Sequence, residues 1–160
     1  MNPQKHILAL DLGHRTGWVL FRDGTLRPGE WDLSHYSKTE PGRRFQDFFH
    51  RLMAIHEEFR LTDIYFEEVH GHFGNVTPAH VYAGYKTLLQ FFCAENGIEC
   101  VGVPVQTIKR HATGSGRASK AEVITAMRKE FNPIPIESDN VADAFALLSY
   151  VLAESGISPT

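Results

Sequence analysis

The chain has 160 residues, of which 42% are hydrophobic, and a formal net charge of -3. These values suit one soluble domain over residues 1–160 with a core of its own, and they leave little length for a second domain. No stretch approaches the roughly 18–20 apolar residues of a membrane-spanning helix, and residues 1–6 lack the pattern of a signal peptide, so we expect a cytoplasmic protein that contacts no membrane. The two cysteines, Cys93 and Cys100, have no Cys or His at metal-binding spacing and are expected to be reduced core residues.

The first part of the chain has the pattern of three consecutive antiparallel strands. A nearly continuous apolar run over 6–12 predicts a strand that is buried on both faces. A second strand is expected over 16–22 and a third over 25–33, because the Asp23-Gly24 pair between them is a strong hairpin signal.

Helices and strands alternate in the rest of the chain. A helix is expected over 43–59, a strand over 62–69, a helix from Pro78 to about 96 with Gly97 as its C-cap, and a strand over 98–103. There follow a short helix or turn over 104–112, a helix from the Ser119 cap to about 131, and a last helix capped by Ser138 or Asp139. Because strands joined by helical crossovers are parallel, this order predicts an α/β fold with a mixed five-stranded sheet, three antiparallel strands followed by two parallel ones, flanked by helices on both faces.

Two of the predicted strands end in carboxylates. Asp11 follows a buried apolar run, where a charge is costly unless a cation or hydrogen bonds offset the loss of water; the alternative is an aspartate that caps the turn at Gly13. Glu67 and Glu68 point to opposite faces of their strand, so only one of them can join Asp11. We expect Glu67, with Glu68 as the alternative because the strand register decides between them.

The start of the last helix offers three further oxygen ligands, Asp139, Asn140 and Asp143. Asp143 shares a helix face with either of the other two, being four residues from one and three from the other. It interrupts an apolar run and is expected to face the sheet, whereas Asp139 has the alternative of a simple N-cap. Acids gathered from separate strand and helix ends are typical of a metal site for phosphate chemistry.

Basic residues gather between Lys109 and Lys120. Residues 113–120 read TGSGRASK, a glycine-containing loop before a helix, whose backbone amides can bind a phosphate while Arg117 and Lys120 add positive charge. The spacing differs from that of a Walker A loop, and a plain turn with a helix cap is the alternative.

The loop after the Glu67 strand contains two histidines and an aromatic residue. His70 and His72 have no clear third ligand, so they are weak support for zinc. Phe73 is a candidate for stacking on an unpaired base, and packing within its own loop is the alternative.

Together these motifs resemble the RuvC family of Holliday-junction resolvases, which belongs to the RNase H-like nuclease fold. The resemblance runs in order through ALDLGHRTGW, the FEEV strand end, TIKRHATGSGRASKAEV and the closing DNVADAFALL, and therefore covers most of the chain. It implies a homodimeric crossover junction endodeoxyribonuclease that uses Mg²⁺ or Mn²⁺, two ions per site, and no small-molecule cofactor. Its substrate would be a four-way or other branched DNA junction, in recombination, repair or phage DNA processing.

The resemblance also implies roles for particular residues. Metal ligation transfers to Asp11, Glu67 and Asp143, and the family has an Asp or His where this chain has Asn140. The fourth ligand is therefore expected to be Asn140 through its amide oxygen or Asp139 from one residue earlier, unless the second ion binds more weakly.

The DNA-contacting residues implied by the resemblance are Lys109, Arg117 and Lys120, with Arg110 in the same segment and Phe73 as the candidate stacking aromatic. Lys120 is the closest match, and we expect it to neutralise charge that develops on the phosphate.

Three other functions fit parts of the pattern. A YqgF-like nuclease of the same fold, acting on RNA, has a similar Asp-x-Gly strand end. An actin-like or sugar-kinase ATPase has a similar first phosphate loop but needs two such domains. A module that binds branched DNA without cutting it would explain Asn140 in place of an acid. The sequence leaves open whether the host is a bacterium or its phage.

Overall fold

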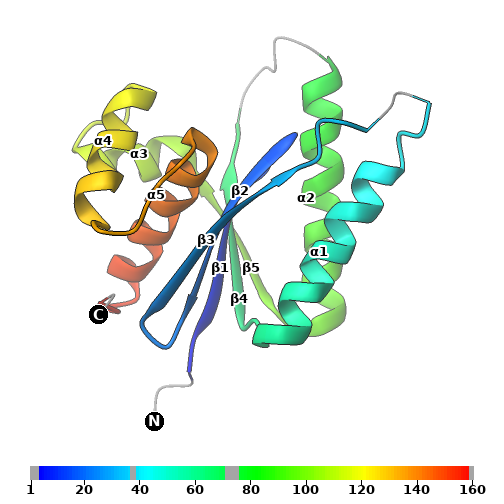
Figure 1. The fold of residues 1–160 in the computed structure, drawn as a ribbon, viewed down its shortest axis with the longest axis horizontal. Helices are drawn as coiled ribbons and strands as arrows, with labels where there is room; N and C mark the ends of the chain where they lie inside the picture. Colours follow the sequence, from blue (N-terminus) through cyan, green and yellow to red (C-terminus); the bar gives the residue numbers. More distant parts are fainter. Residues whose placement is uncertain (1–3, 37–38, 71–75, 159–160) are drawn as a thin grey trace.

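The computed structural model describes residues 4–36, 39–70 and 76–158. A five-stranded sheet separates two helical layers, with α1 and α2 on one side and α3, α4 and α5 on the other (Figure 1). The strands are β1 (His6–Asp11), β2 (Arg15–Arg22), β3 (Thr25–Asp32), β4 (Asp63–Glu68) and β5 (Glu99–Pro104). The helices are α1 (Arg43–Phe59), α2 (Val76–Asn96), α3 (Val105–Thr113), α4 (Lys120–Glu130) and α5 (Asp139–Glu154). Within the described part of the chain, no helix is long and apolar enough to cross a membrane.

The strand order is β3-β2-β1-β4-β5, which confirms the predicted mixed sheet. β2 is antiparallel to both β1 and β3, whereas β4 is parallel to both β1 and β5. The hairpin between β2 and β3 turns at Asp23 and Gly24, whose φ angles of 53° and 79° are those that a two-residue turn requires. β1 lies at the centre of the sheet, so the carboxyl ends of β1 and β4 are neighbours.

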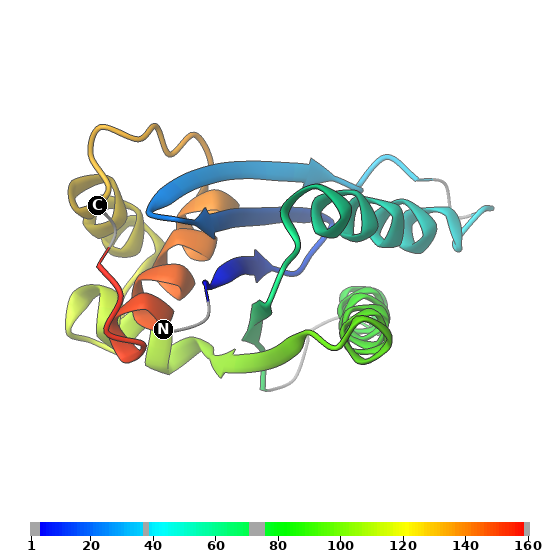
Figure 2. The ribbon, with the colours of Figure 1, turned by 90° about the horizontal axis from the view of Figure 1, so that it is seen from below.

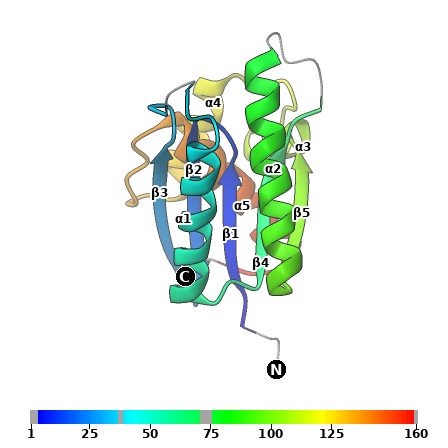
Figure 3. The ribbon, with the colours of Figure 1, turned by 90° about the vertical axis from the view of Figure 1, so that its right-hand side faces the viewer.

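Both faces of β1 are buried, which explains its continuous apolar sequence. Ile7 and Ala9 belong to the core under α3, α4 and α5, and Leu8 and Leu10 belong to the core under α1 and α2. The view in Figure 2 shows the two helical layers on either side of the sheet, and Figure 3 shows α1 and α2 side by side over one face. α5 is buried along most of its length because it packs against β1 and β2 as well as α3 and α4.

The expected element boundaries are met within a few residues, with one informative difference. α2 begins at Val76, two residues before Pro78. A proline is tolerated there because the first four amide groups of a helix have no intrahelical acceptor. α3 is a regular helix over Val105–Thr113 and is capped by Gly114, whose φ is 84°. Both cysteines are free, and Cys93 is buried whereas Cys100 is half-buried.

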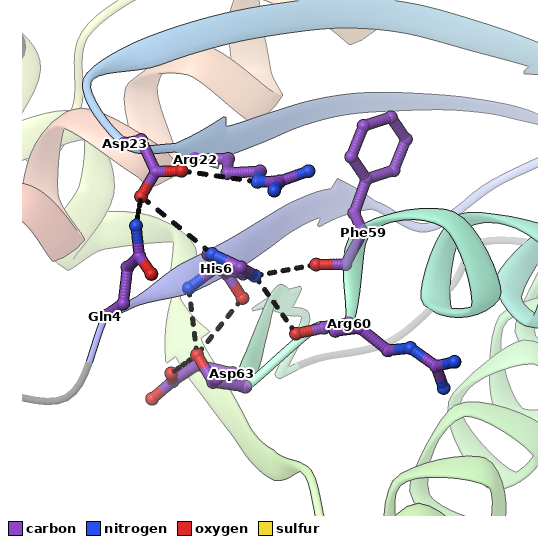
Figure 4. Close-up of polar contacts among 8 residues, drawn as sticks. Gln4, His6, Arg22, Asp23, Phe59, Arg60 and Asp63 are labelled. Atoms are coloured by element: carbon purple, nitrogen blue, oxygen red, sulfur yellow. Dashed lines mark hydrogen bonds and ion pairs between the residues drawn. The ribbon is translucent and has the colours of Figure 1, made fainter.

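Polar contacts around His6 fix the opposite end of β1 (Figure 4). The His6 ring donates from Nδ1 to the backbone carbonyl of Phe59 at 2.6 Å, and its backbone amide donates to Thr62 Oγ1 at 2.9 Å. Asp63 is almost fully buried and accepts a hydrogen bond from Lys5 Nζ at 2.5 Å. These contacts tie the end of α1 to β1 and β4, far along β1 from Asp11.

Candidate active site

Asp11 and Glu67 end neighbouring parallel strands and point to the same face of the sheet. The register pairs Leu10 of β1 with Phe66 of β4, so the next residue of each strand is one of the two acids. Because side chains alternate along a strand, Asp11 lies on the face of Ala9, and Glu67 on the face of Tyr65, which is the face that α5 covers.

Glu68 lies on the other face of β4, under α2. Its carboxylate accepts a hydrogen bond from Lys86 Nζ at 2.5 Å, and His70 Nε2 lies 3.8 Å from its second oxygen. The hydrogen bond from Lys86 is the largest cause that lowers the pKa of Glu68. Of the two adjacent glutamates, the strand therefore brings Glu67 to Asp11 and gives Glu68 a separate cationic partner.

The first turns of α5 bring a third acid to the same face. Ser138 caps the helix by accepting a hydrogen bond from the Val141 amide at 3.2 Å. α5 approaches β2 at Gly17, where an added Cβ would overlap the backbone carbonyl of Asn140 and lie 2.7 Å from the Val141 nitrogen. This close approach delivers Asp143 to the sheet face, with 21% of its side chain exposed, against 47% for Asp139.

Lys120 supplies a positive charge between α4 and α5. It is the first residue of α4, after a capping box formed by Ser119 and Glu122. Its ammonium lies 2.9 Å from Asp139 Oδ2 and 3.5 Å from Asp143 Oδ2. Burial lowers the pKa of Lys120, but its hydrogen bond to Asp139 and the nearby acids outweigh that effect and raise the pKa.

The acids on this face have raised pKa values because they are buried close to one another. Burial is the main reason that the pKa of Asp11 lies well above its usual range, and the charges of Glu67 and Asp143 add to it. Burial, with a contribution from Asp143, raises the pKa of Glu67 to about 7. The pKa of Asp143 is also raised by burial, against the opposing charge of Lys120. Without a bound cation, these three carboxyl groups therefore keep their protons to a higher pH than exposed carboxyl groups do.

A divalent cation fits the chemistry of this cluster. Its donors are carboxylate oxygens, which Mg²⁺ and Mn²⁺ prefer, and a bound cation would offset the burial and mutual repulsion that raise their pKa values. Among the described residues, no three His, Cys, Asp or Glu side chains already stand as a closed metal-binding group. Lys120 supplies a positive charge that contacts Asp139 and Asp143 at the edge of this cluster.

The two candidates for a fourth ligand are engaged elsewhere. Asp139 pairs with Lys120, whose hydrogen bond is the largest cause that lowers the pKa of this aspartate. Asn140 donates from Nδ2 to Glu30 Oε2 of β3 at 3.0 Å. Sequence reasoning missed Glu30, because an acid on the edge strand β3 has the pattern of a solvent-exposed residue.

The predicted basic residues lie at different distances from the acids. Lys109 is half-buried on α3, and its positive charge opposes the rise in pKa of both Glu67 and Asp143. Arg110 and Arg117 are exposed, Arg117 in the turn that leads to α4. Two candidates from the loop after β4, His72 and Phe73, lie outside the described residues.

The overall arrangement defines the class of fold. A mixed five-stranded sheet with helices on both faces is what the order of elements predicted, and with carboxylates at the ends of its central parallel strands it is the RNase H-like α/β fold that the resemblance implied. No protein-family model matches the sequence, and no curated protein matches it significantly.

Solved structures identify the particular form of that fold. The chain superposes on Thermus thermophilus RuvC with a TM-score of 0.73 and 20% identity, over 94% of this chain and 96% of that one. For the same protein in complex with a Holliday junction substrate, the TM-score is 0.75 and the sequence identity 19%, over 95% of this chain and 96% of that one. For the yeast mitochondrial Holliday junction resolvase Ydc2, the TM-score is 0.64 and the sequence identity 14%, over 92% of this chain and 78% of that one. The fold is therefore that of RuvC, as the sequence motifs suggested.

Proposed function

We propose that this protein is a metal-dependent endonuclease that cuts four-way or other branched DNA. The observation that carries the proposal is the half-buried acid cluster of Asp11, Glu67 and Asp143 beside Lys120, at the ends of the central strands of a RuvC fold. The solved structure of T. thermophilus RuvC with a Holliday junction substrate supports branched DNA as the substrate class.

Asp11, Glu67 and Asp143 would hold Mg²⁺ or Mn²⁺, because both ions prefer carboxylate oxygen ligands. A divalent cation bound there supplies an activated water and stabilises the leaving oxygen of a phosphodiester. Lys120 offers a positive charge to the phosphate, in addition to its contacts with Asp139 and Asp143 in the metal-free protein. Asp139 and Asn140, the two residues expected to offer a further oxygen ligand, contact Lys120 and Glu30 instead.

Basic side chains beside the cluster would hold the DNA backbone. Lys109, Arg110, Arg117 and Lys120 come from α3, the following turn and the start of α4, next to the acid cluster. Phosphate contacts of this kind position DNA without reading its sequence, so the formal charge of -3 does not exclude DNA binding.

A homodimer is part of the proposal, because a four-way junction has two equivalent strands to cut. Two large apolar side chains are exposed among the described residues, Phe91 on α2 with 55% exposure and Met53 on α1 with 38%. Both belong to the helical layer opposite α3, α4 and α5, so pairing through that layer would leave the acid cluster open to DNA. Residues 1–160 are proposed as one nuclease domain acting in the cytoplasm.

Strand cleavage of defined substrates tests the proposal. We expect nicking of a four-way DNA junction with Mg²⁺ or Mn²⁺, and no nicking by Asp11→Asn or Asp143→Asn, which should still bind the junction in a gel-shift assay. Glu68→Gln is the matched control for Glu67→Gln, because it removes the neighbouring carboxylate from the other sheet face.

The same substrates separate the alternatives. Preference for structured RNA or a DNA–RNA hybrid over the junction would favour a YqgF-like nuclease. A junction that is bound but stays intact with Mn²⁺ would make the protein a non-catalytic DNA-binding module.

A further inference from the structure

Glu30 of β3 joins the edge of the sheet to the first turn of α5. Its Oε2 atom accepts a hydrogen bond from Ser138 Oγ at 2.7 Å and another from Asn140 Nδ2 at 3.0 Å. Ser138 is the N-cap of α5, and Asn140 is the second residue of that helix. One carboxylate therefore holds the helix start at two points.

The place of Glu30 in the sheet makes this contact specific. In the β2–β3 register, Glu30 pairs with Gly17, where the backbone of α5 comes too close to β2 to leave room for a Cβ. Arg15 Nη1 lies 3.8 Å from the other oxygen of Glu30, so the carboxylate is also held from the β2 side. The contact thus lies at the point where the backbone of α5 rests on the sheet.

We propose that Glu30 is a positioning residue for the acid cluster, and that Asn140 is its hydrogen-bond donor rather than a substitute for a metal-binding acid. Asp139 and Asp143 lie on the turns that follow Ser138, so the position of this helix start sets where their carboxylates meet Asp11 and Glu67. This inference rests on the proposed metal-dependent function.

The chemistry of the pair explains why an amide stands at position 140. An ionised Glu30 can only accept hydrogen bonds, and the Asn140 amide nitrogen donates one. An aspartate at position 140 would instead place a second carboxylate about 3 Å from the first, where like charges repel. If Asn140 stood in place of an acidic metal ligand, Asn140→Asp should tighten metal binding. Because Glu30 lies next to position 140, we expect Asn140→Asp to weaken metal binding instead.

A double-mutant cycle over Glu30→Gln, Asn140→Asp and the double variant tests the proposal. Mn²⁺ binding is measured by electron paramagnetic resonance on the full chain without DNA, and the Mn²⁺ concentration for half-maximal junction nicking is measured separately. We expect Asn140→Asp to weaken Mn²⁺ binding by about tenfold, the usual size of an effect on residues that orient metal ligands. Adding Glu30→Gln should recover most of that loss, because the glutamine amide can donate to the new carboxylate.

Two controls separate positioning from damage to the fold. Glu137→Gln removes an exposed acid just before the Ser138 cap and should leave Mn²⁺ binding unchanged. Recovery in the double variant would trace the loss to the contact between positions 30 and 140, and circular-dichroism spectra in EDTA that match the wild type would exclude misfolding as its cause.

The outcomes of the cycle are distinct. Mn²⁺ binding by Asn140→Asp that equals or exceeds that of the wild type, or a double variant no better than Asn140→Asp, would overturn the positioning role. If the wild type binds Mn²⁺ but leaves junctions intact, the nuclease proposal fails. The positioning role of Glu30 is then still tested by whether Glu30→Gln recovers the Mn²⁺ binding that Asn140→Asp loses. A wild type that binds no Mn²⁺ overturns both.

Discussion

Replacing Glu67 by glutamine should stabilise the metal-free protein at pH 8. Burial raises the pKa of this carboxyl from 4.5 to about 7, so the folded state binds its proton more tightly than the unfolded state does. The stabilising contribution of the proton is therefore complete below pH 4.5 and is lost as the pH rises to about 7. A glutamine avoids the burial of charge that wild-type protein must bear at pH 8.

The size of the effect follows from the two pKa values. At about 1.4 kcal/mol for each pH unit between them, the wild type loses at most about 3 kcal/mol between pH 4.5 and pH 8. For a chain of this length, that corresponds to an increase of roughly 6–12 °C in the melting temperature of Glu67→Gln at pH 8. At pH 4.5 the two proteins should melt at nearly the same temperature.

Thermal unfolding followed by circular dichroism in EDTA measures this difference. Glu68→Gln is the matched control, because the Lys86 partner of Glu68 lowers the pKa of that carboxyl, and its loss should slightly destabilise the protein at pH 8. Adding Mg²⁺ at pH 8 should raise the melting temperature of the wild type and have little effect on Glu67→Gln. A Glu67→Gln protein that is less stable than wild type at pH 8 in EDTA would refute the buried, mutually repelling cluster.

Three further changes test other parts of the site. Gly17→Ala should destabilise the protein by about 2 kcal/mol or more in urea unfolding, because the added Cβ overlaps the start of α5. Gly13→Ala is the control, because its added Cβ meets no atom closer than 3.6 Å. Lys120→Met should lower the melting temperature at pH 8 in EDTA, because the acids lose their counter-charge, and should slow single-turnover nicking by about 100-fold or more. Phe91→Glu should convert a dimer to a monomer in analytical ultracentrifugation; an unchanged sedimentation coefficient would place the dimer interface elsewhere.

Much of the fold could be predicted from the sequence because its signals are local. The Asp23-Gly24 turn and the crossovers through α1 and α2 determine which strands are antiparallel and which parallel. Strand alternation alone required Glu67 and Glu68 to lie on opposite faces, and the register then brought Glu67 to the α5 side.

The contact between Glu30 and α5 could not be predicted in this way. The hydrogen-bond partners of Glu30 are 108 and 110 residues further along the chain, so no periodic pattern links them. Asn140 was expected as a ligand because its spacing to Asp143 suits a shared helix face and because the resemblance implies an Asp or His at this position. Only the packing of α5 on β2 shows that its amide nitrogen is held by Glu30.

Cleavage of a labelled four-way DNA junction by the wild type and by Asp11→Asn, with Mg²⁺ as the only divalent ion, is the most direct test of the proposed nuclease. We expect the wild type to nick the junction and to leave linear duplex of the same sequence intact. Asp11→Asn should bind the junction as tightly as the wild type and leave it uncut, because it lacks the most deeply desolvated acid of the cluster. An intact junction with the wild type, or equal nicking by both proteins, would contradict the role given to the acid cluster.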